Sequence, residues 1–122
     1  MKTLMAIFVG GGLGSVARYA ISRLTVLIFG STVFPLGTLM ANIFSSALLA
    51  ILVVYIGKEY FQGLWIPFLI IGFCGGFSTF STFSYETFIL LNEGKWIWAG
   101  ANVLISVFTC LVLLYFISKQ LA

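Results

Sequence analysis

Long apolar stretches dominate the sequence, and its nine charged residues lie in a few places around them. The hydrocarbon core of a bilayer is about 30 Å thick and takes about 20 helical residues to cross. The longest uncharged run, residues 24–57, contains Gly and Pro in a turn-like segment at 30–37, which disfavours continuous helix. We therefore predict four membrane-spanning helices, at about residues 3–29, 36–56, 64–91 and 96–118.

The composition indicates the class of protein. Hydrophobic residues make up 61% of the chain and charged residues 7%, whereas about 25% of the residues of a soluble domain are charged. Four crossings use nearly all of the 122 residues, so we expect one all-α membrane domain, residues 1–122, in the lipid bilayer. The first apolar run is longer than the core of a signal peptide, and we expect it to be a permanent span.

Two classes of function lack the residues that they need. The sequence has no His and no pair of neighbouring carboxylates, and neither Cys74 nor Cys110 has a basic partner nearby. Hydrolytic and metal-dependent catalysis are therefore excluded, and we do not expect an enzyme. The net charge of +3 is not gathered into a basic cluster, which argues against a nucleic-acid partner.

The positive charges divide evenly between the two sides expected of a protein with four crossings. An excess of Lys and Arg on one side normally fixes the orientation. Without it the chain can insert both ways, and two opposite copies can form an antiparallel homodimer. A single orientation set by other cues is the alternative. The two sets are Lys2, Lys58 and Lys119 against Arg18, Arg23 and Lys95.

Small residues in the first span suit close contact between helices. Four helices of this length do not easily enclose a polar path, so association of two copies is expected on this ground too. The small residues are Gly10, Gly11, Gly12 and Gly14.

The third span contains the most unusual stretch, residues 72–86, with a repeated Phe-Ser-Thr sequence. Gly75 and Gly76 followed by Ser and Thr are poor material for a continuous helix, so we predict a break near mid-membrane. Backbone carbonyls freed at a break must find partners in protein, water or an ion. The carbonyl oxygens of Gly75 and Ser78 are candidates to hold a cation, shared by two copies on their two-fold axis.

Aromatic and hydroxyl side chains alternate after this break. Phe80 and Phe83 are three residues apart, and the positive edge of an aromatic ring can face an anion. The hydroxyls of Ser81 and Thr82 can supply hydrogen bonds beside them. The alternative is that these rings only pack or face lipid.

Two other spans carry polar stripes at helical spacing. Thr38 and Asn42 lie one turn apart in the second span, and Ser106 and Cys110 lie one turn apart in the fourth. Such residues often join helices by hydrogen bonds. Stripes in two spans are better explained by a shared polar path, in which an amide replaces part of the hydration shell of an anion.

Two charged residues lie within the predicted spans. Arg18 is expected to reach the far interface and extend its guanidinium into water, where it can gather anions at a vestibule. Glu86 is the only acid inside a span and therefore a candidate functional residue. It can pair with Arg18 or a hydroxyl, or relay protons.

Three segments are similar to those of a known family: residues 11–19 (GGLGSVARY), 37–42 (GTLMAN) and 75–84 (GGFSTFSTFS), of which the third is the most specific. With them the chain resembles, over essentially its whole length, the Fluc (CrcB-type) family of bacterial fluoride channels. The resemblance implies an antiparallel dual-topology homodimer in the bacterial inner membrane. It also implies two fluoride pores, a central structural sodium ion (Na⁺) and passive efflux of cytoplasmic fluoride.

The resemblance further implies roles for individual residues. Phe80 and Phe83 would be the pore phenylalanines, Asn42 the pore amide, and the carbonyls of Gly75 and Ser78 the sodium ligands. The full set of expected pore residues is Thr38, Asn42, Phe80, Ser81, Thr82, Phe83, Ser106 and Cys110.

Two positions depart from the pattern of that family. Cys110 stands where the family often has a hydroxyl, and a thiol is the weaker donor. Ser46 stands where it often has glycine, which puts close helix contact there in doubt.

Two rival functions remain. A proton-coupled small multidrug transporter also has four spans, but it relies on an acid in the first span, which this chain lacks. The second rival is a membrane assembly subunit, in which the polar stripes only join helices.

Overall fold

The computed structural model describes all 122 residues, and helices make up nearly the whole chain. The helices are α1 (Lys2–Phe29), α2 (Leu36–Gly57), η1 (Pro67–Cys74), α3 (Gly75–Phe77), α4 (Phe80–Asn92) and α5 (Trp96–Leu121). Of these, η1 is a stretch of π-helix. Four helical segments are long and apolar enough to cross a membrane: Lys2–Phe29, Leu36–Gly57, Pro67–Asn92 and Trp96–Leu121.

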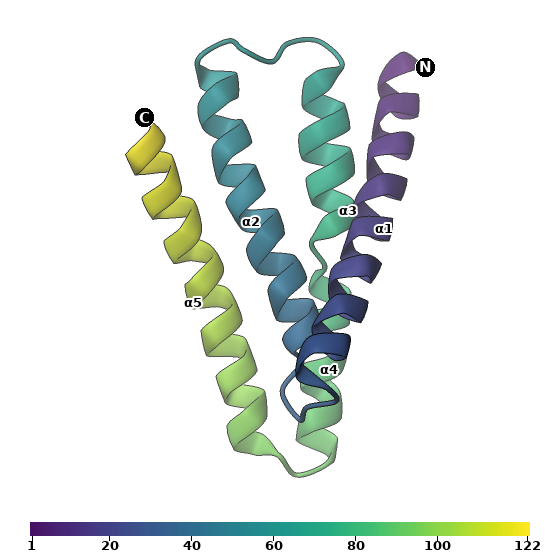
Figure 1. Cartoon of the computed structure of the whole chain (residues 1–122), viewed down its shortest axis with the longest axis vertical. Coiled ribbons are helices and arrows are strands. Elements are labelled where there is room, and N and C mark those ends of the chain that lie inside the picture. The colour runs from purple at the N-terminus through teal and green to yellow at the C-terminus, as the bar shows by residue number, and fades with distance from the viewer.

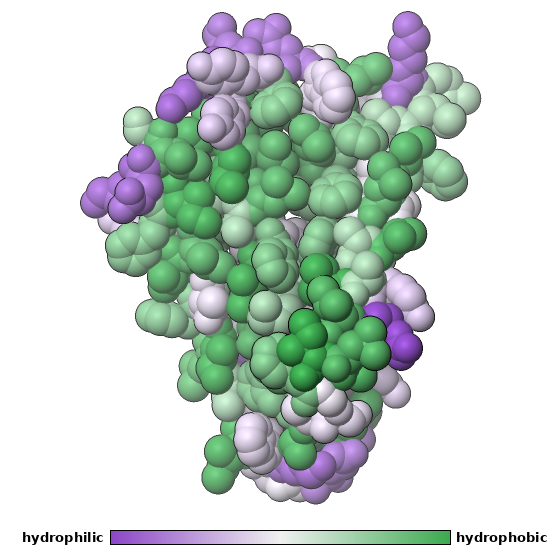
Figure 2. All heavy atoms as spheres, viewed as in Figure 1, coloured by the Kyte–Doolittle hydropathy of each residue, from purple (hydrophilic) through white to green (hydrophobic).

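The four segments run up and down beside one another (Figure 1). Both termini lie at the same end as the connection between α2 and η1, and the other two connections lie at the opposite end. Hydrophilic residues gather at these two ends and apolar residues cover the middle (Figure 2). Only 17 of the 122 residues are buried, so most apolar side chains face outward. The chain is an all-helical, multi-pass membrane protein.

Local sequence explains where the third segment begins and where it is interrupted. It begins at Pro67, and proline suits the first turn of a helix because its missing N–H has no helical partner there. The helix stops after Phe77, and Ser78 and Thr79 are extended, with φ/ψ of −79°/154° and −148°/120°. Thr79 then caps α4, because its hydroxyl oxygen accepts the N–H of Thr82 at 3.2 Å.

Glycines bring α1 into direct backbone contact with η1 and α3. A Cβ on Gly10 would overlap the carbonyl oxygen of Phe68, and one on Gly14 that of Phe73. From the other side, a Cβ on Gly72 would lie 2.9 Å from the carbonyl oxygen of Ile7. The close contact that we expected between two copies therefore forms, at Gly10 and Gly14, inside one chain. Sequence spacing shows that a helix has a small-residue face, but not which helix covers it.

Candidate functional site

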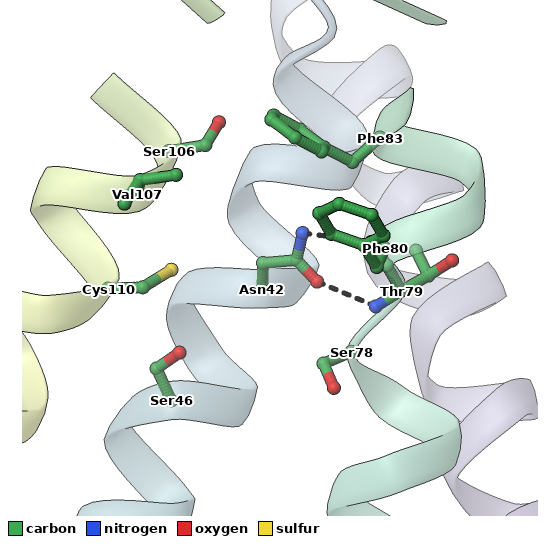
Figure 3. A pocket seen from close by; sticks show the side chains of 9 residues that line it. All are labelled: Asn42, Ser46, Ser78, Thr79, Phe80, Phe83, Ser106, Val107 and Cys110. Atoms are coloured by element: carbon green, nitrogen blue, oxygen red, sulfur yellow. Dashed lines mark hydrogen bonds between the residues drawn. The ribbon is translucent and has the colours of Figure 1, made fainter. Parts of the chain in front are cut away.

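The break between α3 and α4 is held by Asn42 of α2. The Asn42 Oδ1 accepts the backbone N–H of Thr79 at 2.8 Å, and its Nδ2 donates to the carbonyl of Thr79 at 3.3 Å (Figure 3). Because Thr79 is extended, its N–H and C=O both point toward α2. One side-chain amide therefore satisfies both backbone groups of the residue at which the helix is interrupted.

This pairing frees carbonyl oxygens on the α3 side. In a continuous helix the N–H of Thr79 would donate to the carbonyl of Gly75, but here it donates to Asn42. The N–H of Thr82 donates to the Thr79 hydroxyl, and the carbonyl of Ser78 accepts no backbone or side-chain hydrogen bond. Gly75 and Ser78 are both exposed on the isolated chain. The break thus leaves carbonyl oxygens without hydrogen-bond partners in two exposed residues.

Neighbouring carbonyls at the break are satisfied by side chains from α1, α2 and the segment itself. The carbonyl of Cys74 accepts the hydroxyls of Ser45 at 3.1 Å and Ser78 at 3.0 Å. The Arg18 Nε donates to the carbonyl of Gly76 at 3.2 Å. A cation near the C-terminal end of a helix is favourable, because the last carbonyls there carry partial negative charge.

A hollow of about 240 Å³ lies between α2, the break and α5. No charged side chain lines it, and its polar groups are one amide, four hydroxyls and a thiol. Figure 3 shows the amide of Asn42 between the phenylalanines of α4 and the α5 wall. The lining residues are Asn42, Ser46, Ser78, Thr79, Phe80, Phe83, Ser106, Val107 and Cys110.

The two phenylalanines differ in their surroundings. Phe83 is 8% exposed, whereas Phe80 is 78% exposed on the isolated chain. Their ring centroids are 5.7 Å apart with planes inclined at 41°. Because α4 is helical, residues three apart share a face, which is why both rings reach the same hollow.

A hydrogen-bonded chain fixes the α5 wall of the hollow. The buried Asn102 donates through Nδ2 to the hydroxyl of Thr87 at 2.8 Å and accepts the hydroxyl of Ser106 at 3.2 Å. Thr87 in turn donates to the carbonyl of Phe83 at 2.8 Å. These hydrogen bonds link α5 to α4, the two helices on either side of the hollow. Asn102 therefore joins the two helices, whereas Ser106 and Cys110 border the hollow.

Three expected pore residues lie elsewhere. Thr38 donates its hydroxyl to Glu86 Oε1 at 2.7 Å. Thr82 accepts the hydroxyl of Thr79 at 3.2 Å, and the exposed Ser81 hydroxyl lies 3.4 Å from that of Thr79. Ser81 and Thr82 point away from the hollow because they are one and two residues from Phe80, on other faces of α4.

A second set of hollows runs along α1 and the start of α2. One, of about 220 Å³, is lined by Arg18, Ser22, Thr38 and Thr82 among others. It shares Ser22 and Thr38 with a hollow of about 230 Å³, which also includes Glu86. Glu86 is shared in turn with a hollow of about 510 Å³ at the 31–35 connection. Polar surface therefore extends from the break to the end of the molecule.

The two charged residues of the spans do not contact each other. Arg18 donates through Nε to the carbonyl of Gly76 at the end of α3, and its expected position at the far interface stays a prediction. Glu86 pairs with a hydroxyl, that of Thr38. The second carboxylate oxygen of Glu86 is buried without a hydrogen-bond partner.

Some residues of the site were missed by sequence reasoning. Thr79 organises the break through its backbone and caps α4; a Thr directly before a helix is a recognisable cap signal. Val107 also lines the hollow, one position beyond Ser106 of the polar stripe, whereas Ser46, which lines it too, lies one turn after Asn42 in the stripe of the second span. No feature of the sequence pointed to Thr87, since its role depends on the contact between α4 and α5.

Comparison with known proteins decides the family. A family model described as "CrcB-like protein, Camphor Resistance (CrcB)" matches residues 5–117. The chain belongs to the CrcB family. A relative from Coxiella burnetii (strain Dugway 5J108-111) named "Fluoride-specific ion channel FluC" is 47% identical over 111 residues, 88% of each chain.

Other relatives of the CrcB chain carry the same name. The Pyrococcus abyssi protein is 44% identical over 117 residues, which cover 94% of this chain and 92% of the relative. The Rhodospirillum rubrum protein is 40% identical over 113 residues, 90% of this chain and 87% of the relative. The similarity thus covers all four long helical segments.

Proposed function

We propose that this CrcB-family chain is a fluoride-selective ion channel and not an enzyme. Its relatives are named fluoride-specific ion channels. The observation that carries the proposal is the uncharged hollow in which the amide of Asn42, hydroxyls and the rings of Phe80 and Phe83 meet.

This lining suits a small, strongly hydrated anion. An ion sheds water only where the pore supplies replacements, and it leaves only if no single site binds it too tightly. Neutral donors and ring edges meet both needs, because they attract fluoride without the strong hold of a fixed positive charge. Cys110 and Ser106 continue the donors along α5, one turn apart.

A second copy completes the pore. The hollow is open on one side, and Phe80 and Ser78, which line it, are exposed on the isolated chain, as is Gly75 at the break. Exposed backbone carbonyls are costly in lipid, so this face is expected to meet protein. The partner is a second copy of this chain, and the break then lies near mid-membrane.

An antiparallel arrangement of the two copies fits the charges. Lys2 begins α1, Lys58 follows α2 and Lys119 lies in the last turn of α5, at the end with both termini, whereas Arg23 lies near the end of α1 and Lys95 directly before α5, toward the other end. Arg18, which sequence spacing assigned to the second set, points to the break instead. The remaining excess of one is a weak orienting signal, so both orientations are expected to occur.

A sodium ion between the two copies fits the residues at the break. No group of His, Cys, Asp and Glu is placed to hold a metal ion, so only neutral oxygens are available. The carbonyls of Gly75 and Ser78 are hard oxygen donors without helical partners. A sodium ion held by these carbonyls would supply positive charge beside the break.

The second set of hollows is proposed as the access route from water. Arg18 at its inner end provides the positive charge that concentrates anions, and Glu86 lies between this point and the 31–35 connection. In a bacterial cell membrane, fluoride that entered as neutral HF would leave through the pore as the anion. An inside-negative potential drives that efflux, so no coupling group is required.

Flux from liposomes tests the proposal. The purified protein is reconstituted with internal potassium fluoride, valinomycin sets an outward-driving potential, and a fluoride electrode records efflux. A channel releases fluoride rapidly and excludes chloride. Efflux that depends on a proton gradient would indicate a coupled transporter, and absence of flux would indicate an assembly subunit; either result refutes the proposal.

A further inference from the structure

We infer that Asn42 is a positioning residue for the cation site: it keeps the carbonyl of Gly75 available by holding the N–H of Thr79. The inference rests on the proposed function, because it concerns the sodium ion of the proposed channel. Asn42 then has two roles: the pore role expected of it, and a second role that acts through the backbone of Thr79, to which its side chain is hydrogen-bonded.

The first step is the competition for one carbonyl. Continuing the helix would direct the N–H of Thr79 at the carbonyl of Gly75. The 2.8 Å bond to Asn42 Oδ1 removes that donor. A carbonyl that accepts a helical hydrogen bond is a poorer ligand and is turned along the helix axis, whereas a freed one can turn toward an ion.

The second step is the fit between an amide and an extended residue. Thr79 has φ/ψ of −148°/120°, which places its N–H and C=O on one side of the chain, as in a β-strand. Asn42 pairs with both, at 2.8 and 3.3 Å. Without Asn42, both groups would lack partners at a depth without bulk water, a costly state. Helical closure onto Gly75 then becomes the favoured outcome for the N–H.

The third step separates Asn42 from its neighbours. Ser45 lies one turn further along α2 and also contacts the break, through the carbonyl of Cys74. That carbonyl keeps two other donors, the N–H and the hydroxyl of Ser78, each at 3.0 Å. Loss of the Ser45 hydroxyl therefore leaves the break satisfied, which makes Ser45→Ala a matched control.

The experiment compares sodium dependence in Asn42→Ala, Asn42→Asp and Ser45→Ala. Thermal unfolding of the purified dimer is followed at increasing NaCl, with N-methylglucamine chloride keeping ionic strength constant. Because a ligand that binds only the folded state raises its stability, the NaCl concentration at half of this effect reports the affinity of the site. Fluoride flux is measured over the same NaCl series.

Asn42→Ala is expected to raise the half-effect sodium concentration at least about tenfold, since one hydrogen bond lost at a buried backbone group has an effect of this order. Asn42→Asp keeps an acceptor for the Thr79 N–H but loses the donor to the Thr79 carbonyl, so it is expected to raise that concentration clearly less than Asn42→Ala does, whatever its negative charge does to fluoride flux. Ser45→Ala is expected to match the wild type.

Two results would overturn the inference: an unchanged sodium concentration in Asn42→Ala, or equal increases in the Asp and Ala variants. If the Ala variant does not fold, the half-effect sodium concentration of the Asp variant is compared with that of the wild type instead. A wild type that conducts fluoride and is indifferent to sodium refutes the cation site, and with it this inference, but not the channel. A wild type that binds sodium without conducting fluoride refutes the channel and leaves the positioning role testable by unfolding.

Discussion

The seam between α1 and the third segment makes a strong prediction for Gly14. Substitution of Gly14 by Ala adds a Cβ that would overlap the carbonyl oxygen of Phe73 and lie 2.9 Å from Phe77 N and 3.0 Å from Phe73 C. All three atoms belong to backbone, so no side-chain rotation can relieve the contact. Carbon atoms in good contact lie about 3.5 to 4.0 Å apart, so the two helices must separate by about 1 Å.

This separation has two costs. Overpacking a tight contact destabilises a protein by about 1 to 3 kcal/mol, and a gap of about 1 Å forfeits up to half of the dispersion energy of the contacts nearby. Arg18 lies one turn beyond Gly14, so its 3.2 Å bond to Gly76 is expected to weaken as well. We therefore expect the Ala variant to lose about 2 to 3 kcal/mol of unfolding free energy.

Reversible unfolding in mixed micelles provides the assay. The fraction of denaturing detergent is raised, and tryptophan fluorescence and circular dichroism follow the loss of structure. Gly12→Ala is the control, because a Cβ at Gly12 meets no atom within 4 Å. If Gly14→Ala unfolds within about 0.5 kcal/mol of Gly12→Ala, a range typical of innocuous surface substitutions, the reasoning about this seam is wrong.

Three further predictions concern the hollow. Replacing Phe80 or Phe83 by Ile removes a ring edge while keeping apolar bulk, and each change is expected to reduce fluoride flux about tenfold, the upper end of measured aromatic contributions. Cys110→Ser supplies a stronger donor and is expected to raise the flux about two- to fivefold, the effect of one modest hydrogen bond. Asn102→Leu breaks the link between Thr87 and α5 and is expected to cost about 1 to 2 kcal/mol of unfolding free energy.

Each of these predictions has its own contrary outcome. Flux unchanged in both phenylalanine variants, with the proposed dimer intact by size exclusion, would refute a role of the rings in conduction. A Cys110→Ser flux equal to that of Cys110→Ala would show that no donor is needed there. For Asn102, the comparison is Val103→Leu, whose side chain is 40% exposed; equal stability of the two variants would show that the buried chain does not join α4 to α5.

Much of the fold can be predicted from the chain alone because each crossing of the membrane demands a long apolar run. Gly75 and Gly76 before Ser and Thr predicted an interruption, which lies directly after Phe77. The π-helical geometry of η1 could not be predicted, since its apolar residues suit either type of helix.

The site could be predicted only in part, because a single sequence does not show which helices contact each other or where their side chains point. Helical rise gives the depth of Arg18 but not its rotamer, and the free carbonyl of Gly76 determines its direction. Phe80 and Phe83 lie on the face of α4 that borders the hollow, whereas Ser81 and Thr82 lie on other faces. Helical periodicity is sufficient to predict this difference. A hydroxyl was among the partners expected for Glu86, but a single sequence does not show which one, because Thr38 lies 48 positions away.

The way in which the break is held has a consequence for assembly of the protein in the membrane. The groups that stabilise it come from α1 and α2, through Arg18 and Asn42. An isolated third segment in lipid would have none of them, and it would satisfy its backbone best as an uninterrupted helix. The break is therefore expected to form only when α1 and α2 pack against the third segment, and the proposed ion-binding centre would be absent until that step is complete.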